Sequence, residues 1–106
     1  MKKCYRRYEV LLPLQFNDGR PVPEALVAQT LREFQQTFGA VSCETQTIRG
    51  LWQHGGKIYR DDLIRLFVDV EDSPENFREF KRMKNRLKRR FKQLDIWITT
   101  YPIDVV

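Results

Sequence analysis

The segment "AVSCETQTIRGLWQHGGKIYRDDLIRLFVDV", residues 40–70, decides the fold, because two stretches of alternating side chains flank a glycine pair. A two-residue hairpin turn needs positive φ angles, which Gly55 and Gly56 adopt at little steric cost. A turn at these glycines fixes which residues face each other, and it sets an opposite-charge pair and an aromatic pair in register. The segment therefore predicts a long β-hairpin. The predicted pairs are Val41–Val70, Cys43–Val68, Thr45–Leu66, Thr47–Ile64, Arg49–Asp62 and Trp52–Tyr59.

Two more strands and two helices are predicted around this hairpin. Apolar residues recur at helical spacing in two segments, and turn-forming or capping residues bound each of them. The resulting order, βαββαβ, predicts a ferredoxin-like α+β sandwich with an antiparallel sheet in the order 4-1-3-2 and both helices on one face. A single domain over residues 1–106 is expected. The predicted elements are a strand at 8–14, a helix from Pro23 to Gly39, a helix from Pro74 to Leu94 with Ser73 as its cap, and a strand at 95–103.

Alternation along the strands divides their side chains between two faces of the sheet. The side chains expected to face the helices are Val10, Leu12, Val41, Cys43, Ile64, Leu66, Val68, Val70, Ile96 and Ile98. The helix-free face, called the open face here, should be polar if it is solvated, yet it also receives large apolar groups. We therefore expect a partner to cover it. The expected apolar groups of the open face are Leu11, Ile48, Trp52, Tyr59, Leu63, Phe67, Trp97 and Tyr101, and Asp61 and Arg65 lie among the interleaved charges.

Arg65 is the most informative charge on that face, because it lies on a central strand among aromatic residues. A charged side chain is costly to bury unless an opposite charge meets it. Arg65 therefore needs an acid such as Glu9, Glu44 or Asp69, or an anionic ligand.

The organisation of the chain is similar to that of small uncharacterised bacterial proteins with a ferredoxin-like domain and no assigned activity. The runs "YEVLLPLQFNDGRPVP", "GLWQHGGKIYRDDLIRLFVDV" and "LKRRFKQLDIWITTYPI" carry this resemblance, which spans most of the chain. It implies the same domain, and it supplies no catalytic residue.

The net charge of +5 comes from one segment, residues 74–93, which holds nine Lys and Arg side chains against two Glu. A basic helix face can bind phosphates, so nucleic acid is an alternative partner. The helices cover the sheet face opposite the aromatic groups, so we expect the basic and aromatic patches to form no continuous groove. The candidate phosphate contacts are Arg78, Arg82, Lys88, Arg89 and Lys92.

Several site types are not predicted. Cys4 and Cys43 are far apart and lack the spacing of a disulfide framework or a zinc site, which fits a reducing cytoplasm. Asp61 and Asp62 are neighbours in a strand, so their carboxylates point to opposite faces and cannot share an acid–base site. No metal site, cofactor or catalytic residue is therefore assigned, and no segment reaches the length of a membrane span.

Three functions remain open from the sequence. The leading one is a non-catalytic domain that self-associates as a homo-oligomer through the open face, with room to enclose a small ligand near Asp61, Arg65 and Trp97. The alternative is a nucleic-acid-binding module that uses the basic second helix. The second alternative is a small enzyme with a pocket on the open face.

Overall fold

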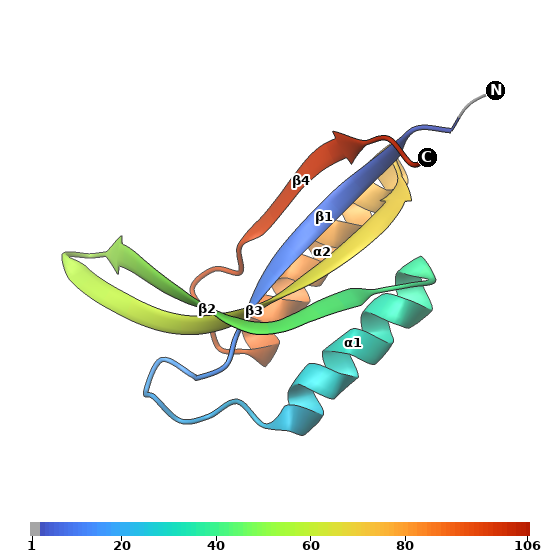
Figure 1. Ribbon diagram of the computed structural model, residues 1–106. Coiled ribbons are helices and arrows are strands. Elements are labelled where there is room, and N and C mark those ends of the chain that lie inside the picture. Colours follow the sequence, from blue (N-terminus) through green and yellow to red (C-terminus); the bar gives the residue numbers. More distant parts are fainter. Residues whose placement is uncertain (1–2) are drawn as a thin grey trace.

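The computed structural model describes residues 3–106 and consists of one four-stranded sheet and two helices (Figure 1). The strands are antiparallel and lie in the order β2-β3-β1-β4, which is the predicted 4-1-3-2 order counted from the opposite edge. The ferredoxin-like α+β fold is therefore confirmed. In chain order the elements are β1 (Tyr5–Pro13), α1 (Glu24–Phe38), β2 (Ser42–His54), β3 (Lys57–Glu71), α2 (Pro74–Arg90) and β4 (Ile98–Ile103).

Capping residues that were visible in the sequence fix three helix ends. Pro23 directly precedes the first residue of α1, and Gly39 ends this helix with φ at 90°, in the left-handed region that glycine tolerates. At the start of α2, the Ser73 hydroxyl accepts a hydrogen bond from the backbone N–H of Asn76 at 3.2 Å, and Pro74 occupies the first turn.

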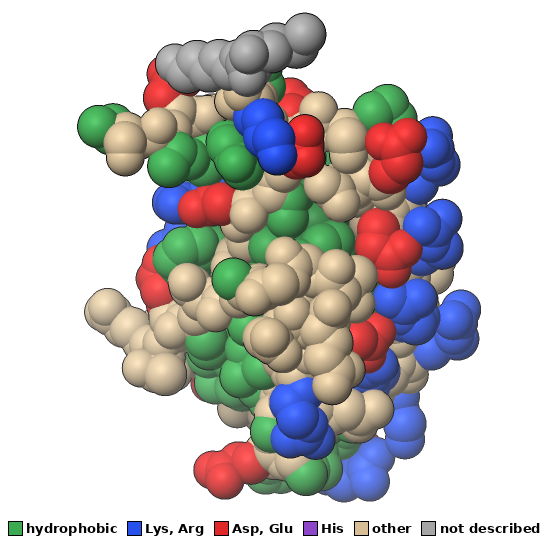
Figure 2. Space-filling model, turned by 90° about the vertical axis from the view of Figure 1, so that its right-hand side faces the viewer, with side chains coloured by type: hydrophobic (Ala, Val, Ile, Leu, Met, Phe, Trp, Pro, Cys, Tyr) green, Lys and Arg blue, Asp and Glu red, His purple; other side chains and the backbone are tan. Residues whose placement is uncertain are grey.

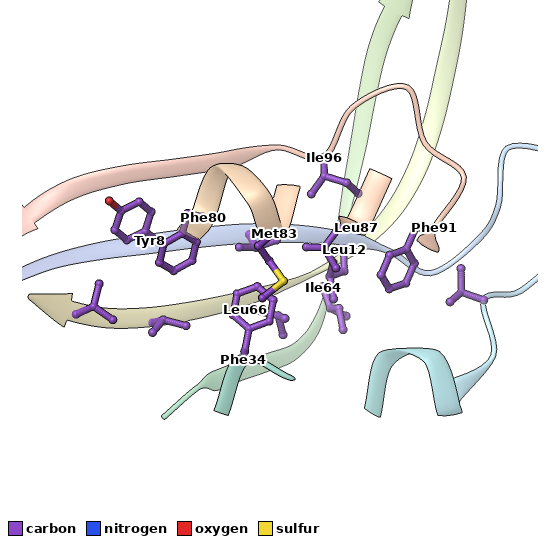
Figure 3. Close-up of a cluster of buried hydrophobic side chains, with 14 residues drawn as sticks. Tyr8, Leu12, Phe34, Ile64, Leu66, Phe80, Met83, Leu87, Phe91 and Ile96 are labelled. Carbon is purple, nitrogen blue, oxygen red and sulfur yellow. The ribbon is translucent and has the colours of Figure 1, made fainter. Parts of the chain in front are cut away.

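The core lies between the sheet and the two helices (Figure 3). Seven of the ten strand residues predicted to face the helices are buried, and Val41, Cys43 and Ile98 pack against them. Side chains of both helices, including Phe34 from α1 and Met83 from α2, are buried in the same cluster. Both helices therefore cover one face of the sheet, as predicted.

Tyr8 is a core residue that the strand pattern did not identify. Its ring stacks on Phe80 of α2 with the ring centres 3.8 Å apart, and Phe80 in turn stacks on Phe38 of α1 at 4.3 Å. Burial raises the pKa of the Tyr8 hydroxyl. This row of three rings joins β1 to both helices.

α2 ends at Arg90, one turn before the predicted end at Leu94. Lys92 adopts a left-handed φ of 54°, and the backbone N–H of Gln93 donates to the carbonyl of Lys88 at 2.9 Å. These are the features of a Schellman motif, which terminates a helix and turns the chain sharply. The motif directs residues 91–97 back toward the sheet.

Two apolar residues of the segment predicted as the second helix are not in the core. Phe77 is 50% exposed and Leu94 is 51% exposed, whereas Met83 is fully buried. Leu94 lies beyond the helix end, which explains its exposure.

The β2–β3 hairpin turns where the glycine pair predicted. Gly55 and Gly56 have φ angles of 58° and 78°, and the register is as predicted from the turn back to the pair Ile48–Leu63. The Arg49–Asp62 ion pair is present at 3.4 Å, and the rings of Trp52 and Tyr59 stack 4.5 Å apart.

The predicted register fails further from the turn, because β2 contains a bulge between Glu44 and Ile48. Three residues, 45–47, are inserted where β3 has only Ile64, so that Cys43 pairs with Leu66 and not with Val68. The shift is two residues, which returns every side chain to its expected face. The predicted pairs Val41–Val70, Cys43–Val68, Thr45–Leu66 and Thr47–Ile64 are not formed.

The hairpin also extends beyond the rest of the sheet. β1 pairs with β3 only as far as Pro13 opposite Leu63, so residues 50–61 form a ribbon of two strands, called the arm here. In Figure 1 the arm curves away from both helices, and it contributes to a longest dimension of 49 Å, against 30 and 25 Å in the other directions.

On its other side, β1 loses its partner even earlier. The last β1–β4 pair is Val10 with Ile98, and the Leu11 N–H then donates to the carbonyl of Trp97 at 3.0 Å. Pro13 is the next residue whose backbone nitrogen points to this free edge, and it has no N–H to leave unpaired. The end of β1 therefore tolerates an open edge at this position.

Candidate functional site

A groove of about 930 Å³ lies where the arm, the free end of β1 and the loop between α2 and β4 meet. Its walls come from the sheet, the arm, α2 and the loop that follows α2. The lining residues are Leu11, Pro13 and Leu63 of the sheet, residues 50–54 and Asp61 of the arm, Lys84 and Lys88 of α2, and residues 93–97 of the loop.

Hydrogen bonds and ion pairs fix two walls of the groove. The indole N–H of Trp52 donates to the Asp61 carboxylate at 2.5 Å, and the same indole stacks on Tyr59. On the opposite side, Lys84 Nζ lies 3.0 Å from Asp95 Oδ1 and so ties α2 to the loop. The arrangement provides aromatic surface, a carboxylate and ammonium groups, which are suited to recognition of a ligand.

Trp97 is the most exposed aromatic side chain of the site. Trp97 is 63% exposed. Its backbone carbonyl, in contrast, accepts the hydrogen bond from the Leu11 N–H. The indole is therefore presented at the groove by an anchored segment of backbone.

About half of the residues predicted for the open-face site line the groove. Tyr59, Arg65, Phe67 and Tyr101 do not line it, and Lys88 comes to it from the predicted nucleic-acid set. The predicted open-face residues that line it are Leu11, Trp52, Asp61, Leu63 and Trp97.

Arg65 is neutralised by side chains of the chain itself. It contacts Glu44 at 3.2 Å and Glu9 at 3.5 Å, two of the acids that the sequence offered, and the negative charge of Glu44 is the main cause of the raised pKa of Arg65. Its Nε is buried without a partner among residues 3–106. Arg65 therefore does not require an anionic ligand to balance its charge.

The rest of the central open face is also satisfied internally. Arg7 pairs with Asp69 at 2.7 Å, and this pair raises the pKa of Arg7. The Arg7 guanidinium lies 4.7 Å from the centre of the Phe67 ring and partly covers it. The eight expected apolar groups lie as predicted, but only Trp97 and Tyr101 are exposed, and the other six are half-buried.

The expectation that basic and aromatic patches lie apart is wrong for two residues. Lys84 and Lys88 line the same groove as Trp52 and Trp97. The reason is that β4 does not extend past Val10 of β1, so no strand separates the C-terminal end of α2 from the open face there.

Two of the five arginines of α2, Arg86 and Arg90, join this helix to α1. Figure 2 shows Lys and Arg gathered along one side of the molecule with Asp and Glu among them. The Glu33 carboxylate of α1 forms ion pairs with Arg86 at 2.9 Å and with Arg90 at 2.5 Å. These ion pairs join the two helices, so their charges are not available to a partner.

The candidate phosphate contacts divide into two groups. Arg78 pairs with Glu75 at 3.6 Å and Arg82 with Glu79 at 2.6 Å. Lys88, Arg89 and Lys92 have no acidic partner within the described part of the chain. The basic surface that is free to bind is therefore smaller than the sequence indicated, and it lies at the C-terminal end of α2.

Across residues 3–106, no three His, Cys, Asp or Glu side chains gather as they would around a metal ion. Neither helix has the length and apolar character needed to span a membrane, among the residues described.

Sequence reasoning missed several parts of the site, namely Pro13, Gly50, Leu51, Gln53, His54, Lys84 and the loop residues 93–96. The sequence placed Leu94 at the end of the second helix, and Lys84 was not singled out as a site residue. Only the early end of α2 and the curvature of the arm bring these residues together, and neither is visible as a motif.

Neither a protein-family model nor a curated protein sequence matches the chain. Solved structures are similar to it. A phage SAM lyase in complex with S-methyl-5'-thioadenosine has a TM-score of 0.69 and 16% identity, over 99% of this chain and 93% of the lyase. The divalent cation tolerance protein CutA1 of Thermus thermophilus has a TM-score of 0.66 and 13% identity, over 96% and 86%. CutA of Synechococcus elongatus has a TM-score of 0.63 and 10% identity, over 96% and 79%. At these identities the similarity establishes the ferredoxin-like fold alone.

Proposed function

We propose that this chain is a non-catalytic domain that assembles with further copies of itself, and that the arm and the adjoining edge of the open face form the contact. The arm carries this proposal. It is a two-stranded ribbon that begins at the Gly50–Asp61 pair and ends at the His54–Lys57 pair. Among the residues described, no third strand pairs with it. Ribbons of this kind are marginally stable in water on their own.

The arm also exposes two large apolar side chains. Leu51 and Ile58 are 66% and 69% exposed, and both lie on the arm face that continues the core face of the sheet. In Figure 1 the arm curves away from both helices, and about two thirds of each of these two residues stays exposed. A contact that buries both side chains removes this apolar surface from water and stabilises the ribbon.

A second copy of the chain suits this surface, because each copy also exposes aromatic side chains at the edge of the open face. Trp97 and Tyr101 are 63% and 41% exposed at the edge of the open face, close to the start and middle of β4. A symmetric assembly would cover the arm and this edge together, since every copy contributes both. The central open face contributes less, because Arg7 already covers Phe67.

Light scattering on the eluate of a size-exclusion column tests the proposal. We expect wild type to be an oligomer and Ile58→Glu to be a folded monomer, because a carboxylate on the arm would have to be buried without a partner. Phe77→Glu is the matched control, since Phe77 is also half exposed but lies on α2. A monomeric wild type at high concentration, or equal dissociation of both variants, would overturn the proposal.

Nucleic-acid binding is a second candidate function. Its support is that Lys88, Arg89 and Lys92 have no acidic partner in residues 3–106, and that Lys88 shares the groove with both tryptophans. Cations beside exposed aromatic rings are the common means of binding single-stranded nucleic acid. An enzyme that uses the groove remains a third alternative.

A further inference from the structure

We infer that the groove binds a small ligand that combines a planar aromatic ring with an anionic group, the chemistry of a nucleoside monophosphate. The groove is built by a single chain, so this inference goes beyond the proposed assembly and does not depend on it. Its volume of about 930 Å³ lies within the range of small-molecule sites.

The aromatic half of the ligand is indicated by the two tryptophans. They are the only tryptophans of the chain, and both line the groove. Trp52 is held in place by Asp61 and Tyr59, and the backbone of Trp97 is held by Leu11. Partly exposed indoles are good stacking surfaces for a planar ring.

The anionic half is indicated by Lys88. It lines the groove, and no carboxylate pairs with it among residues 3–106, whereas Lys84 is already bound to Asp95. Arg89 and Lys92 follow in the last turn and just beyond it, and they too lack acidic partners in this part of the chain. The positive potential around Lys88 is therefore not neutralised locally and would attract a phosphate.

Asp61 supplies a third point of recognition. Its Oδ2 accepts the hydrogen bond from Trp52, while its Oδ1 accepts none among the described residues. Asp61 lines the groove, and its second carboxylate oxygen can accept a hydrogen bond from an amino group on the ring of the ligand. The groove thus combines a ring surface, an acceptor for an amino group and a cation for an anion.

Titration with AMP, followed by tryptophan fluorescence, tests this inference. Excitation at the red edge of the indole band avoids absorption by adenine, and both fluorophores lie in the groove. We expect a saturable change with a dissociation constant below about 1 mM. Adenosine should bind more weakly than AMP, because it lacks the anionic group, and inorganic phosphate should leave the emission unchanged.

Two lysines of α2 provide a matched pair of variants. Lys88→Ala should weaken AMP binding about tenfold and leave adenosine binding unchanged, because it removes a charge-assisted contact to the phosphate. Lys81→Ala should bind AMP like wild type, since Lys81 lies on the same helix outside the groove. The same titration on Ile58→Glu, which should be monomeric, separates this inference from the assembly, because AMP should bind to this variant at least as tightly as to wild type.

Three outcomes would overturn the inference. The first is no saturable change in wild type. The second is equal weakening by Lys81→Ala and Lys88→Ala, which would indicate non-specific attraction to the helix. The third is far tighter binding of a single-stranded oligonucleotide than of AMP, which would assign the groove to nucleic acid.

Discussion

Substitution of Glu33 tests whether the arginines of α2 stabilise the folded state. On α1, the Glu33 carboxylate accepts hydrogen bonds from Arg86 at 2.9 Å and from Arg90 at 2.5 Å, both on α2. The Arg90 side chain is only 14% exposed, and its one other hydrogen bond among residues 3–106 goes to Thr30 Oγ1 at 3.0 Å. The substitution Glu33→Ala would leave the Arg90 guanidinium largely buried without a counter-charge.

The expected cost follows from this burial. A hydrogen bond to a charged group contributes about 1.5–3 kcal/mol, whereas an exposed ion pair contributes about 0.2–1 kcal/mol. The Glu33 side chain is itself 25% exposed, so we expect a loss near the lower half of the first range, about 2 kcal/mol. The higher helix propensity of alanine offsets only a few tenths of a kcal/mol of this loss. For a domain of this size, the midpoint of thermal unfolding should fall by about 10 °C.

Thermal and urea unfolding at neutral pH, followed by circular dichroism, measure this cost. Glu75→Ala is the control, because Glu75 pairs with Arg78 at 3.6 Å and both side chains are more than half exposed. It should lose about 0.5 kcal/mol, which includes its contribution at the first turn of α2. Equal losses in the two variants would refute the reasoning, and the cations of α2 would then be free to serve a partner.

Two further predictions concern charge. Hydrogen bonds from Arg82 and Arg86 hold the pKa of Glu79 below its ordinary value of 4.5, so its ionised form adds stability that is present above this pH and lost as the pH falls. Thermal melting should therefore depend more steeply on acid in wild type than in Glu79→Gln, and parallel curves would contradict this assignment. For nucleic acid, anisotropy of labelled single-stranded DNA and RNA should show binding at low salt that weakens steeply with added salt and is lost when Lys88, Arg89 and Lys92 are all changed to Ala. A flat titration of wild type at low salt would remove this candidate function.

The sequence predicted those features of the fold that local geometry determines. Gly55 and Gly56 set the turn, and the register that follows from them is correct as far as Ile48. Gly39 and Ser73 mark helix ends in the same way. Alternation identified the buried face of every strand, because the bulge shifts the register by an even number of residues.

The bulge itself could not be predicted. Thr45, Gln46 and Thr47 are polar, exposed residues that would also fit a regular edge strand. Their insertion depends on how β2 curves around the sheet, and the alternating pattern does not record this curvature.

The candidate site was predicted only in part, because it depends on where elements stop. The sequence assigned Trp52, Asp61 and Trp97 to the open face, but it gave no indication of a groove there. Their gathering into a groove requires the early start of the loop after Arg90 and the absence of a β4 residue opposite Leu11. Element ends are set by tertiary packing and by the Lys92 backbone, and a lysine is not a typical left-handed residue.

Hydrogen exchange of the arm tests the proposed assembly most directly. Backbone amides of residues 50–61 should exchange slowly at a high protein concentration, where copies cover the arm, and much faster after dilution to monomers. Amides of the core strand β1 should be protected at both concentrations. Exchange of the arm that is equally fast at both concentrations would show that no second copy covers it, and would contradict the account.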